Sequence, residues 1–215
     1  DKIELILEFE SQHPHDPEHL QGLSNFTFAL LEEGTKNFTQ QKMVEEIAKR
    51  GIQLEVQAGV ISMTVMQDDL LFALELLYEL VQNALFEPQA IEKVRTQILS
   101  DIADFWDEPN EFIKQLAREH VYKGHGYSKR FLGTKETVAA ITRDDIMHYY
   151  REHVTPHACL AVVGNIDEST LKGYIGETLG KWQSVEKKEY TFSLLEVPEK
   201  KEIIHPITRD QVVLA

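Results

Sequence analysis

Hydrophobic and polar residues alternate at the start of the chain and in two later segments, and this period of two predicts β-strands. Ile3, Leu5 and Leu7 alternate with glutamates, which is typical of a half-buried strand. The segments IQLEVQA and VISMTVM have the same period and are joined by Ala58 and Gly59. Two such segments with a short glycine-containing connection predict a β-hairpin.

Apolar residues recur at helical spacing through most of the remaining chain. The predicted helices cover residues 22–33, 40–50, 69–81, 88–104, 110–121, 135–140, a segment beginning at Thr142, and 167–182. Gly34 is a plausible stop for the first of these helices, and Pro88 suits the first turn of the fourth. Thr142 opens TRDD, which has the pattern of a capping box with Asp in place of Glu.

The second predicted helix has an apolar face and a signal at each end. Thr39 is a candidate N-cap, and Gly51 closes the segment. The apolar face consists of Met43, Val44, Ile47 and Ala48. We therefore expect a short amphipathic helix with these four side chains toward the core.

The late segment HACLAVVGN is continuously apolar, so we expect a buried strand. Cys159 lies inside it and is the one cysteine of the chain, which excludes an internal disulfide and a cysteine metal cluster. We expect this thiol to be a small buried hydrophobe. The final segment, QVVLA, is strand-like.

Strands mixed with helices predict an α+β fold with a mostly antiparallel or mixed sheet and with helices packed on one face. We find no internal repeat and no low-complexity linker, so residues 1–215 are predicted to form a single domain. The chain begins on a strand-like segment and ends within QVVLA. We expect it to be a fragment of a longer protein.

Charge narrows the range of partners. The 215 residues include 36 acidic and 22 basic side chains, for a formal net charge of −14. Phosphates of nucleic acids and anionic membrane surfaces would be repelled, whereas a basic peptide is electrostatically allowed. No apolar run approaches the roughly 20 residues that cross a bilayer, and no signal segment opens the sequence.

Most familiar catalytic motifs are missing from the sequence. The turn VVGNID has one glycine and no lysine, so it is neither a dinucleotide loop nor a P-loop, and no Gly-x-Ser-x-Gly elbow occurs. His13, His15 and His19 share the loop SQHPHDPEH, where a cation site is one hypothesis and ordinary exposed histidines are the other. His148 and His153 are five residues apart, which is not the i, i+4 spacing of a helical ligand pair.

The stretch GLSNFTFALLEEGT, which follows a loop rich in Pro and Asp, resembles the zinc-site helix of the pitrilysin and insulinase-like zinc metallopeptidases, the inverzincins. Active members read approximately G-L-A-H-F-L-E-H-x-L-x-x-G-T there; both histidines bind zinc and the glutamate activates water. The matching frame residues here are Gly22, Leu23, Phe26, Leu31, Gly34 and Thr35. Two later segments are also similar to the family, ALELLYELVQNALFEPQAIEKVRTQILSDI and FLGTKETVAAITRDDIMHYYREHVTPHACLAVVGNID.

The resemblance also indicates where the chemistry is lost. The positions of the two histidines and the glutamate are filled by Asn25, Ala29 and Phe28, and the position of the third ligand, a glutamate, falls at or near Asp101. Zinc requires nitrogen, sulfur or oxygen donors, and a catalytic site needs three protein ligands with one open position. The resemblance therefore implies a domain that neither binds catalytic zinc nor hydrolyses peptides alone.

Family architecture gives such a domain a role. Inverzincins commonly pair a zinc-bearing half with a degenerate one around a peptide-holding chamber, either in one chain or, as in mitochondrial processing peptidase, in separate subunits. Each half contains two similar domains, and this chain is similar to the first domain of a degenerate half, so the resemblance implies that a second, similar domain follows. The partners implied are a catalytic half that carries the zinc and a peptide substrate. Two alternatives remain: a structural or assembly protein of the same fold, and an enzyme with an atypical metal site in the histidine loop.

Overall fold

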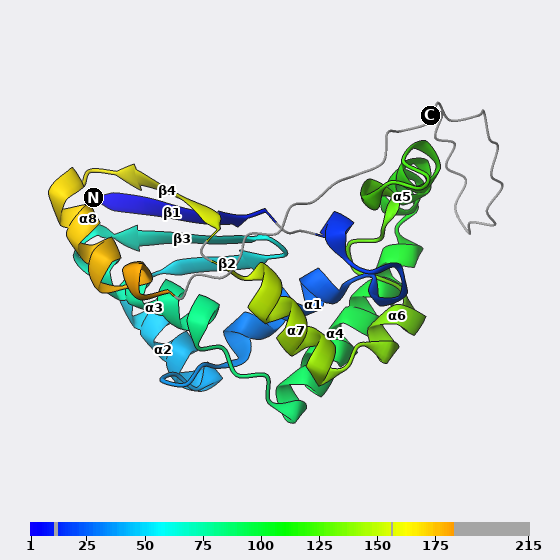
Figure 1. Ribbon diagram of the computed structural model, residues 1–215, viewed down its shortest axis with the longest axis horizontal. Helices are drawn as coiled ribbons and strands as arrows, with labels where there is room; N and C mark the ends of the chain where they lie inside the picture. Colours follow the sequence, from blue (N-terminus) through cyan, green and yellow to red (C-terminus); the bar gives the residue numbers. More distant parts are fainter. Residues whose placement is uncertain (11–12, 156, 183–215) are drawn as a thin grey trace.

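The computed structural model of the protein describes residues 1–10, 13–155 and 157–182. Its strands form one four-stranded sheet in the order β2-β3-β1-β4, and every neighbouring pair is antiparallel. The strands are β1 (Lys2–Phe9), β2 (Gln53–Gln57), β3 (Val60–Met66) and β4 (Ala158–Gly164). Figure 1 shows the helices gathered on one side of this sheet, as the sequence predicts for an α+β fold.

Eight α-helices lie within the described residues. They are α1 (Leu23–Ala29), α2 (Gln40–Arg50), α3 (Leu70–Gln82), α4 (Pro88–Asp107), α5 (Pro109–Val121), α6 (Lys135–Ala140), α7 (Arg143–His153) and α8 (Glu168–Glu177). In Figure 1, α1, α2, α3 and α7 lie below the sheet, whereas α5 lies beyond its end. No helix in the described part of the chain is both long and apolar enough to cross a membrane.

The core lies between the sheet and the helical layer. On β1, Ile3, Leu5, Leu7 and Phe9 are each at most 2% exposed, whereas the residues between them are exposed or half-buried. A strand turns alternate side chains to opposite faces, so the period of two places all four on the helical side. The leucines of α3 at helical spacing, among them Leu74, cover them from below.

The predicted caps are confirmed. The Thr39 hydroxyl accepts a hydrogen bond from the backbone nitrogen of Lys42, and Gly51 ends α2 in the left-handed conformation. Thr142 and Asp145 form the expected capping box at the start of α7. Local sequence therefore sets these helix ends.

The first helix differs from its prediction at its C-terminal end. Residues 22–33 were expected to form one helix, but the α-helical part ends at Ala29 and continues as a 3₁₀ turn, Leu30–Glu33. The chain then leaves through Gly34 to Thr35, whose hydroxyl donates to the buried carboxylate of Glu79 at 2.9 Å. The tighter 3₁₀ turn leads the chain to this hydrogen bond, and the helical spacing of apolar residues alone does not predict such a turn.

Two burial predictions are wrong. Strand β4 is an edge strand, and Cys159 within it is exposed, as is Val163 at 66%. A continuous apolar run indicates a strand buried on both faces, but here helices cover only one face of the sheet. Val44 of α2 is also 52% exposed, so the buried stripe of that helix is narrower than predicted. The strand predicted at QVVLA lies outside the described residues.

Candidate functional site

Helix α1 carries the resemblance to the zinc-site helix, and a carboxylate from the preceding loop fixes its start. Asp16 accepts hydrogen bonds from the backbone nitrogens of Gly22 and Ser24 at 2.9 and 3.1 Å, and from the Ser24 hydroxyl at 3.1 Å. The first amides of a helix have no partner within it, so this carboxylate satisfies two of them. When the group is ionised, its negative charge also lies at the positive end of the helix dipole.

Asp16 is buried, with only 1% of the residue exposed to solvent. Burial raises the pKa of this carboxyl group to about 7, against the opposing effects of its hydrogen bonds to Ser24 and Gly22 and of the positive charge on Lys129. The Lys129 amine donates to the carbonyl oxygens of Pro14 and Asp16, which ties the loop to a distant part of the chain.

Two glycines allow the turn before α6 to approach the start of α1 closely. Gly22 has φ 92° and Gly133 has φ 78°, both in the left-handed region. A Cβ on Gly133 would lie 2.2 Å from the carbonyl oxygen of Gln21, and one on Gly22 would lie 2.6 Å from that of Leu132. The hydroxyl of Thr137 donates to the Gln21 carbonyl at 2.8 Å. Two segments more than 100 residues apart therefore meet backbone to backbone.

The other frame residues of α1 and of the 3₁₀ turn that follows it are structural. Leu23, Phe26 and Leu31 are at most 4% exposed. The guanidinium of Arg95 on α4 lies over the Phe26 ring, 5.2 Å from its centroid, and donates to the carbonyl oxygens of Val138 and Ile141. Arg95 thus links α1 and α4 to the segment that contains α6.

The three positions at which active relatives carry their motif differ in environment. Phe28 is 1% exposed and packs edge-on against Phe9, with ring centroids 5.3 Å apart. Asn25 and Ala29, one helical turn apart, are both half-buried. The core has therefore occupied the glutamate position, whereas the two histidine positions remain partly open to solvent.

Asp101 lies on α4, which packs against α1. It is half-buried, and its carboxylate accepts a hydrogen bond from the Gln97 amide at 2.8 Å. The two helices that the resemblance assigns to zinc binding are therefore neighbours. Across residues 1–10, 13–155 and 157–182, no three His, Cys, Asp or Glu side chains gather where a metal ion could be held.

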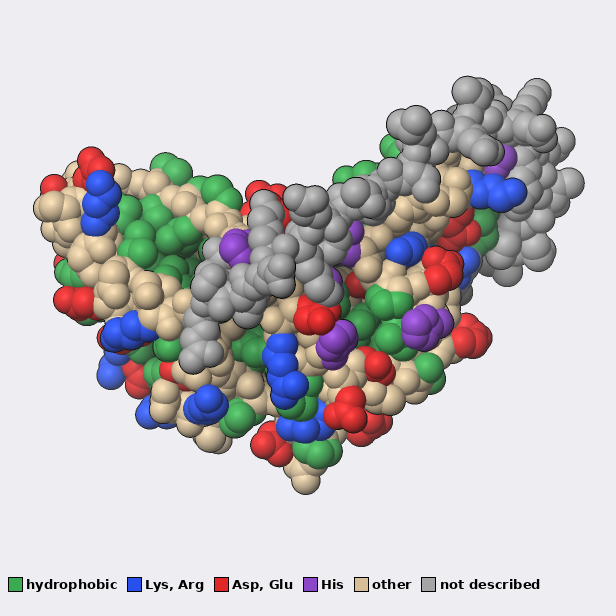
Figure 2. All heavy atoms as spheres, in the orientation of Figure 1, with side chains coloured by type: hydrophobic (Ala, Val, Ile, Leu, Met, Phe, Trp, Pro, Cys, Tyr) green, Lys and Arg blue, Asp and Glu red, His purple; other side chains and the backbone are tan. Residues whose placement is uncertain are grey.

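The histidine loop is the other predicted metal site. His15 is half-buried and His19 is exposed, while the side chain of His13 lies outside the described part. The histidines visible on the face drawn in Figure 2 lie apart from one another. On helix α7, His148 pairs with Glu152 at 3.1 Å, and the His153 ring lies against Tyr149.

The sequence does not predict the role of Asp16, which falls within the loop SQHPHDPEH. An aspartate six residues before Gly22 lies outside the usual capping spacing, so no local signal connects the two. The sequence also does not predict the contact between Gly133 and Gln21. Both depend on how the loops fold back on α1.

Comparison with known proteins finds related sequences. The family model described as insulinase (peptidase family M16) matches residues 4–135, and one described as peptidase M16 inactive domain matches residues 140–215. The zinc protease YmxG of Bacillus subtilis is 24% identical over 186 residues, covering 82% of this chain and 46% of the relative. The mitochondrial-processing peptidase subunit beta of Dictyostelium discoideum is 25% identical, over 68% of this chain and 32% of that subunit.

Solved structures show the same fold. A protease from Helicobacter pylori superposes with a TM-score of 0.82 at 14% identity, covering 92% of this chain and 49% of that one. A peptidase M16 inactive domain from Pseudomonas fluorescens gives 0.78 at 19% identity, with coverages of 87% and 48%. The first half of the periplasmic protease PqqL from Escherichia coli gives 0.76 at 18% identity, with coverages of 89% and 44%.

The chain thus spans about half the length of the curated relatives that it matches. The insulinase model covers more than half of the sequence, and the fold agrees with that of solved family members. The chain therefore belongs to the insulinase family of peptidases, peptidase family M16.

Proposed function

We propose that this chain is a non-catalytic domain of an insulinase-type zinc endopeptidase, the first domain of a half that helps to enclose the peptide. The observation that carries the proposal is the environment of α1. Its motif positions hold Asn25, Phe28 and Ala29, and Phe28 is part of the hydrophobic core. The zinc would belong to the partner half.

The donor chemistry of α1 supports this reading. Alanine and phenylalanine side chains offer no lone pair to a metal, so at most Asn25 and Asp101 are left as oxygen donors. Two oxygens fall short of three protein ligands. Phe28 also removes the base that would take a proton from the attacking water.

The length of this chain relative to that of a solved protease supports a partner half. The chain covers 44% of the first half of PqqL and 23% of the whole protease. A unit of this size corresponds to about half of one half. A catalytic half, on the same polypeptide or on a separate subunit, is therefore the partner that we propose, with peptide as the substrate.

Charge bears on which peptides are held. With a formal charge of −14, this domain favours the approach of basic peptides over acidic ones. The attraction acts over roughly 10 Å at 0.1 M ionic strength and weakens as salt is added. For the peptidase assembled with its zinc-bearing half, the Michaelis constant for a Lys- and Arg-rich peptide should therefore rise with salt more steeply than that for a neutral peptide.

A peptidase assay on three samples tests the proposal: the chain alone, the zinc-bearing half alone, and both together, each with and without chelator. We expect no cleavage by the chain alone and faster chelator-sensitive cleavage by the combination than by the zinc-bearing half. Chelator-sensitive cleavage by the chain alone would contradict the proposal. A combination that forms a stable complex but cleaves no faster than the zinc-bearing half alone would instead support a structural or assembly role.

A further inference from the structure

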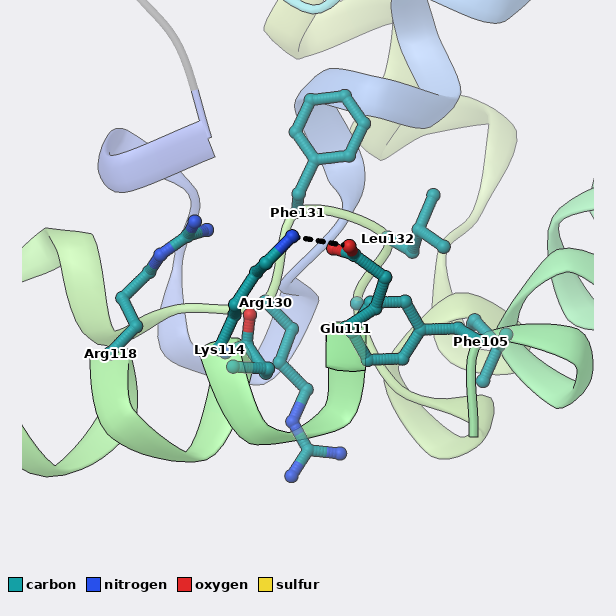
Figure 3. Close-up of a pocket in the computed structure, with 10 residues that line it drawn as sticks. Phe105, Glu111, Lys114, Arg118, Arg130, Phe131 and Leu132 are labelled. Atoms are coloured by element: carbon teal, nitrogen blue, oxygen red, sulfur yellow. Dashed lines mark hydrogen bonds and ion pairs between the residues drawn. The ribbon is translucent and has the colours of Figure 1, made fainter. Parts of the chain in front are cut away.

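A hollow of about 220 Å³ opens beside the end of α4, between α5 and the loop of residues 130–133. Ile102, the neighbour of Asp101, lies in its wall. The other lining residues are Phe105, Glu111, Lys114, Gln115, Arg118, Arg130, Phe131, Leu132 and Gly133. Figure 3 shows Lys114 and Arg118 projecting from α5 on the side where the loop carries Phe131.

The walls of the hollow are largely apolar and are held in place. Phe105, Phe131 and Leu132 are half-buried and line the hollow. The loop is anchored to the start of α1: the backbones of Gly133 and Gln21 approach closely, and the Arg130 backbone nitrogen donates to the Gln21 side chain at 3.1 Å. A concavity whose surface is largely apolar and which also carries polar groups is the usual form of a small-ligand site.

The charges of the lining are not balanced. Arg130 pairs with Glu119 at 2.7 Å, and Glu119 also accepts from Gln115 at 3.1 Å. Lys114 pairs with Glu111 at 2.6 Å (Figure 3). The guanidinium of Arg118 makes no ion pair or hydrogen bond with any residue that the structure describes.

The hollow thus offers one uncompensated guanidinium in a chain whose formal charge is −14. The Lys114–Glu111 pair is exposed on both sides, at 66% and 51%, and such pairs contribute little. Lys114 is therefore able to exchange Glu111 for a ligand anion at small cost. Arginine presents paired N–H donors that match a carboxylate.

We propose that this hollow binds the carboxyl end of a peptide whose last residue is aromatic or large and aliphatic. The side chain would lie against Phe105 and Phe131, and the terminal carboxylate would contact Arg118, with Lys114 as a second cation. The volume suits a single side chain, and the remaining peptide leaves through the open mouth. The choice of a peptide as ligand rests on the proposed function, whereas the recognition chemistry rests on the lining residues alone.

A pair of peptides isolates the carboxylate. A fluorescein-labelled peptide with a Gly/Ser body and a C-terminal Phe is compared with the same peptide as its C-terminal amide, by fluorescence anisotropy against the protein. We expect the acid to bind roughly 10- to 100-fold more tightly, since a charge-assisted hydrogen bond to the carboxylate is lost in the amide.

Two substitutions locate the site. Arg118→Gln should abolish the preference for the acid, whereas the matched control Arg151→Gln, on the exposed surface of α7, should retain it. Phe131→Ala should weaken acid and amide alike, because it removes only apolar contact. If that variant melts early, Phe131→Leu keeps most of the volume, and a peptide ending in Gly makes the same test from the ligand side.

Each opposite result overturns the proposal. Equal binding of acid and amide means that the carboxylate is not recognised, and a preference that survives Arg118→Gln places the carboxylate elsewhere. Absence of binding by either peptide at millimolar concentration removes the site altogether. None of these results depends on zinc or on a partner half, so they leave the cleavage test of the proposed function independent.

Discussion

The start of α1 and its motif positions differ in their surroundings. At the start, Gly22, Leu23 and Ser24 meet requirements of the fold, through a backbone contact, burial and a hydrogen bond to Asp16. The motif positions share no such requirement: Phe28 belongs to the core, while Asn25 and Ala29 are half-buried. Under the proposed function, the contrast teaches how a zinc-site helix could lose its chemistry and keep its place in the fold, because different residues carry the two tasks.

The largest effect should come from the motif position that the core has taken over. Phe28→Ala should lower the free energy of unfolding by about 3–5 kcal/mol, since it opens a cavity against Phe9. Urea denaturation measures the change. Phe72→Ala, at a half-buried ring, is the control and should cost less. A small loss for Phe28→Ala would mean that this position is not structural.

The next effect should come from the close approach at the start of α1. Gly133→Ala combines a positive φ with a Cβ placed 2.2 Å from the Gln21 carbonyl oxygen. Gly124→Ala has nearly the same φ, 79° against 78°, with nothing within 4 Å. We expect Gly133→Ala to cost about 1–3 kcal/mol more than Gly124→Ala in the same unfolding measurement, the usual cost of overpacking. Equal costs would show that the contact is not needed.

Asp16 gives the frame of α1 a dependence on pH. Its pKa rises from 3.8 in the reference state to about 7 in the fold, so the native state binds more protons between these values. Stability from this group is therefore full below about pH 4 and is lost as the pH rises through about 7, with a slope of at most about 1.4 kcal/mol per pH unit.

The Asp16→Asn variant isolates that contribution, because titration of all other groups is common to both proteins. The difference in unfolding free energy, wild type minus variant, should fall as the pH is raised from 4 to 7 and become flat above about 7. A difference that stays level across this range would show that Asp16 is not protonated in the folded protein.

The smallest effects should come from the two half-buried motif positions. Asn25→Ala and Ala29→Ser should each change the free energy of unfolding by no more than about 0.5 kcal/mol, the range of substitutions away from the core. Thermal melting of each variant beside wild type is sufficient. A loss above about 2 kcal/mol at either position would erase the contrast between the start of α1 and its motif positions.

Sequence predicts the elements of this fold better than their surroundings. The period of two in β1, the hairpin and the Thr142 capping box are local signals, and each is confirmed. The exposure of Cys159 on an edge strand depends on which face of the sheet is covered, and local hydrophobicity does not record that. Sheet edges are therefore the weak point of the prediction.

The candidate site is likewise only partly predictable from the sequence. The motif positions Asn25, Phe28 and Ala29 can be identified because the frame residues around them match the family pattern. Asp16 and Gly133 contact residues that are distant in sequence, and Arg118 lines a hollow together with such residues. No rule of sequence spacing therefore identifies these three. The assignment of Asp101 to the third-ligand position stays a prediction of the resemblance.

The most direct test of the central claim is the zinc content of this chain after loading with excess zinc and extensive dialysis, measured by elemental analysis. A protein with a known inverzincin site, treated in parallel, is the control. The account predicts no stoichiometric zinc on this chain, because two of the motif positions offer no donor atom. Close to one zinc per chain would contradict it.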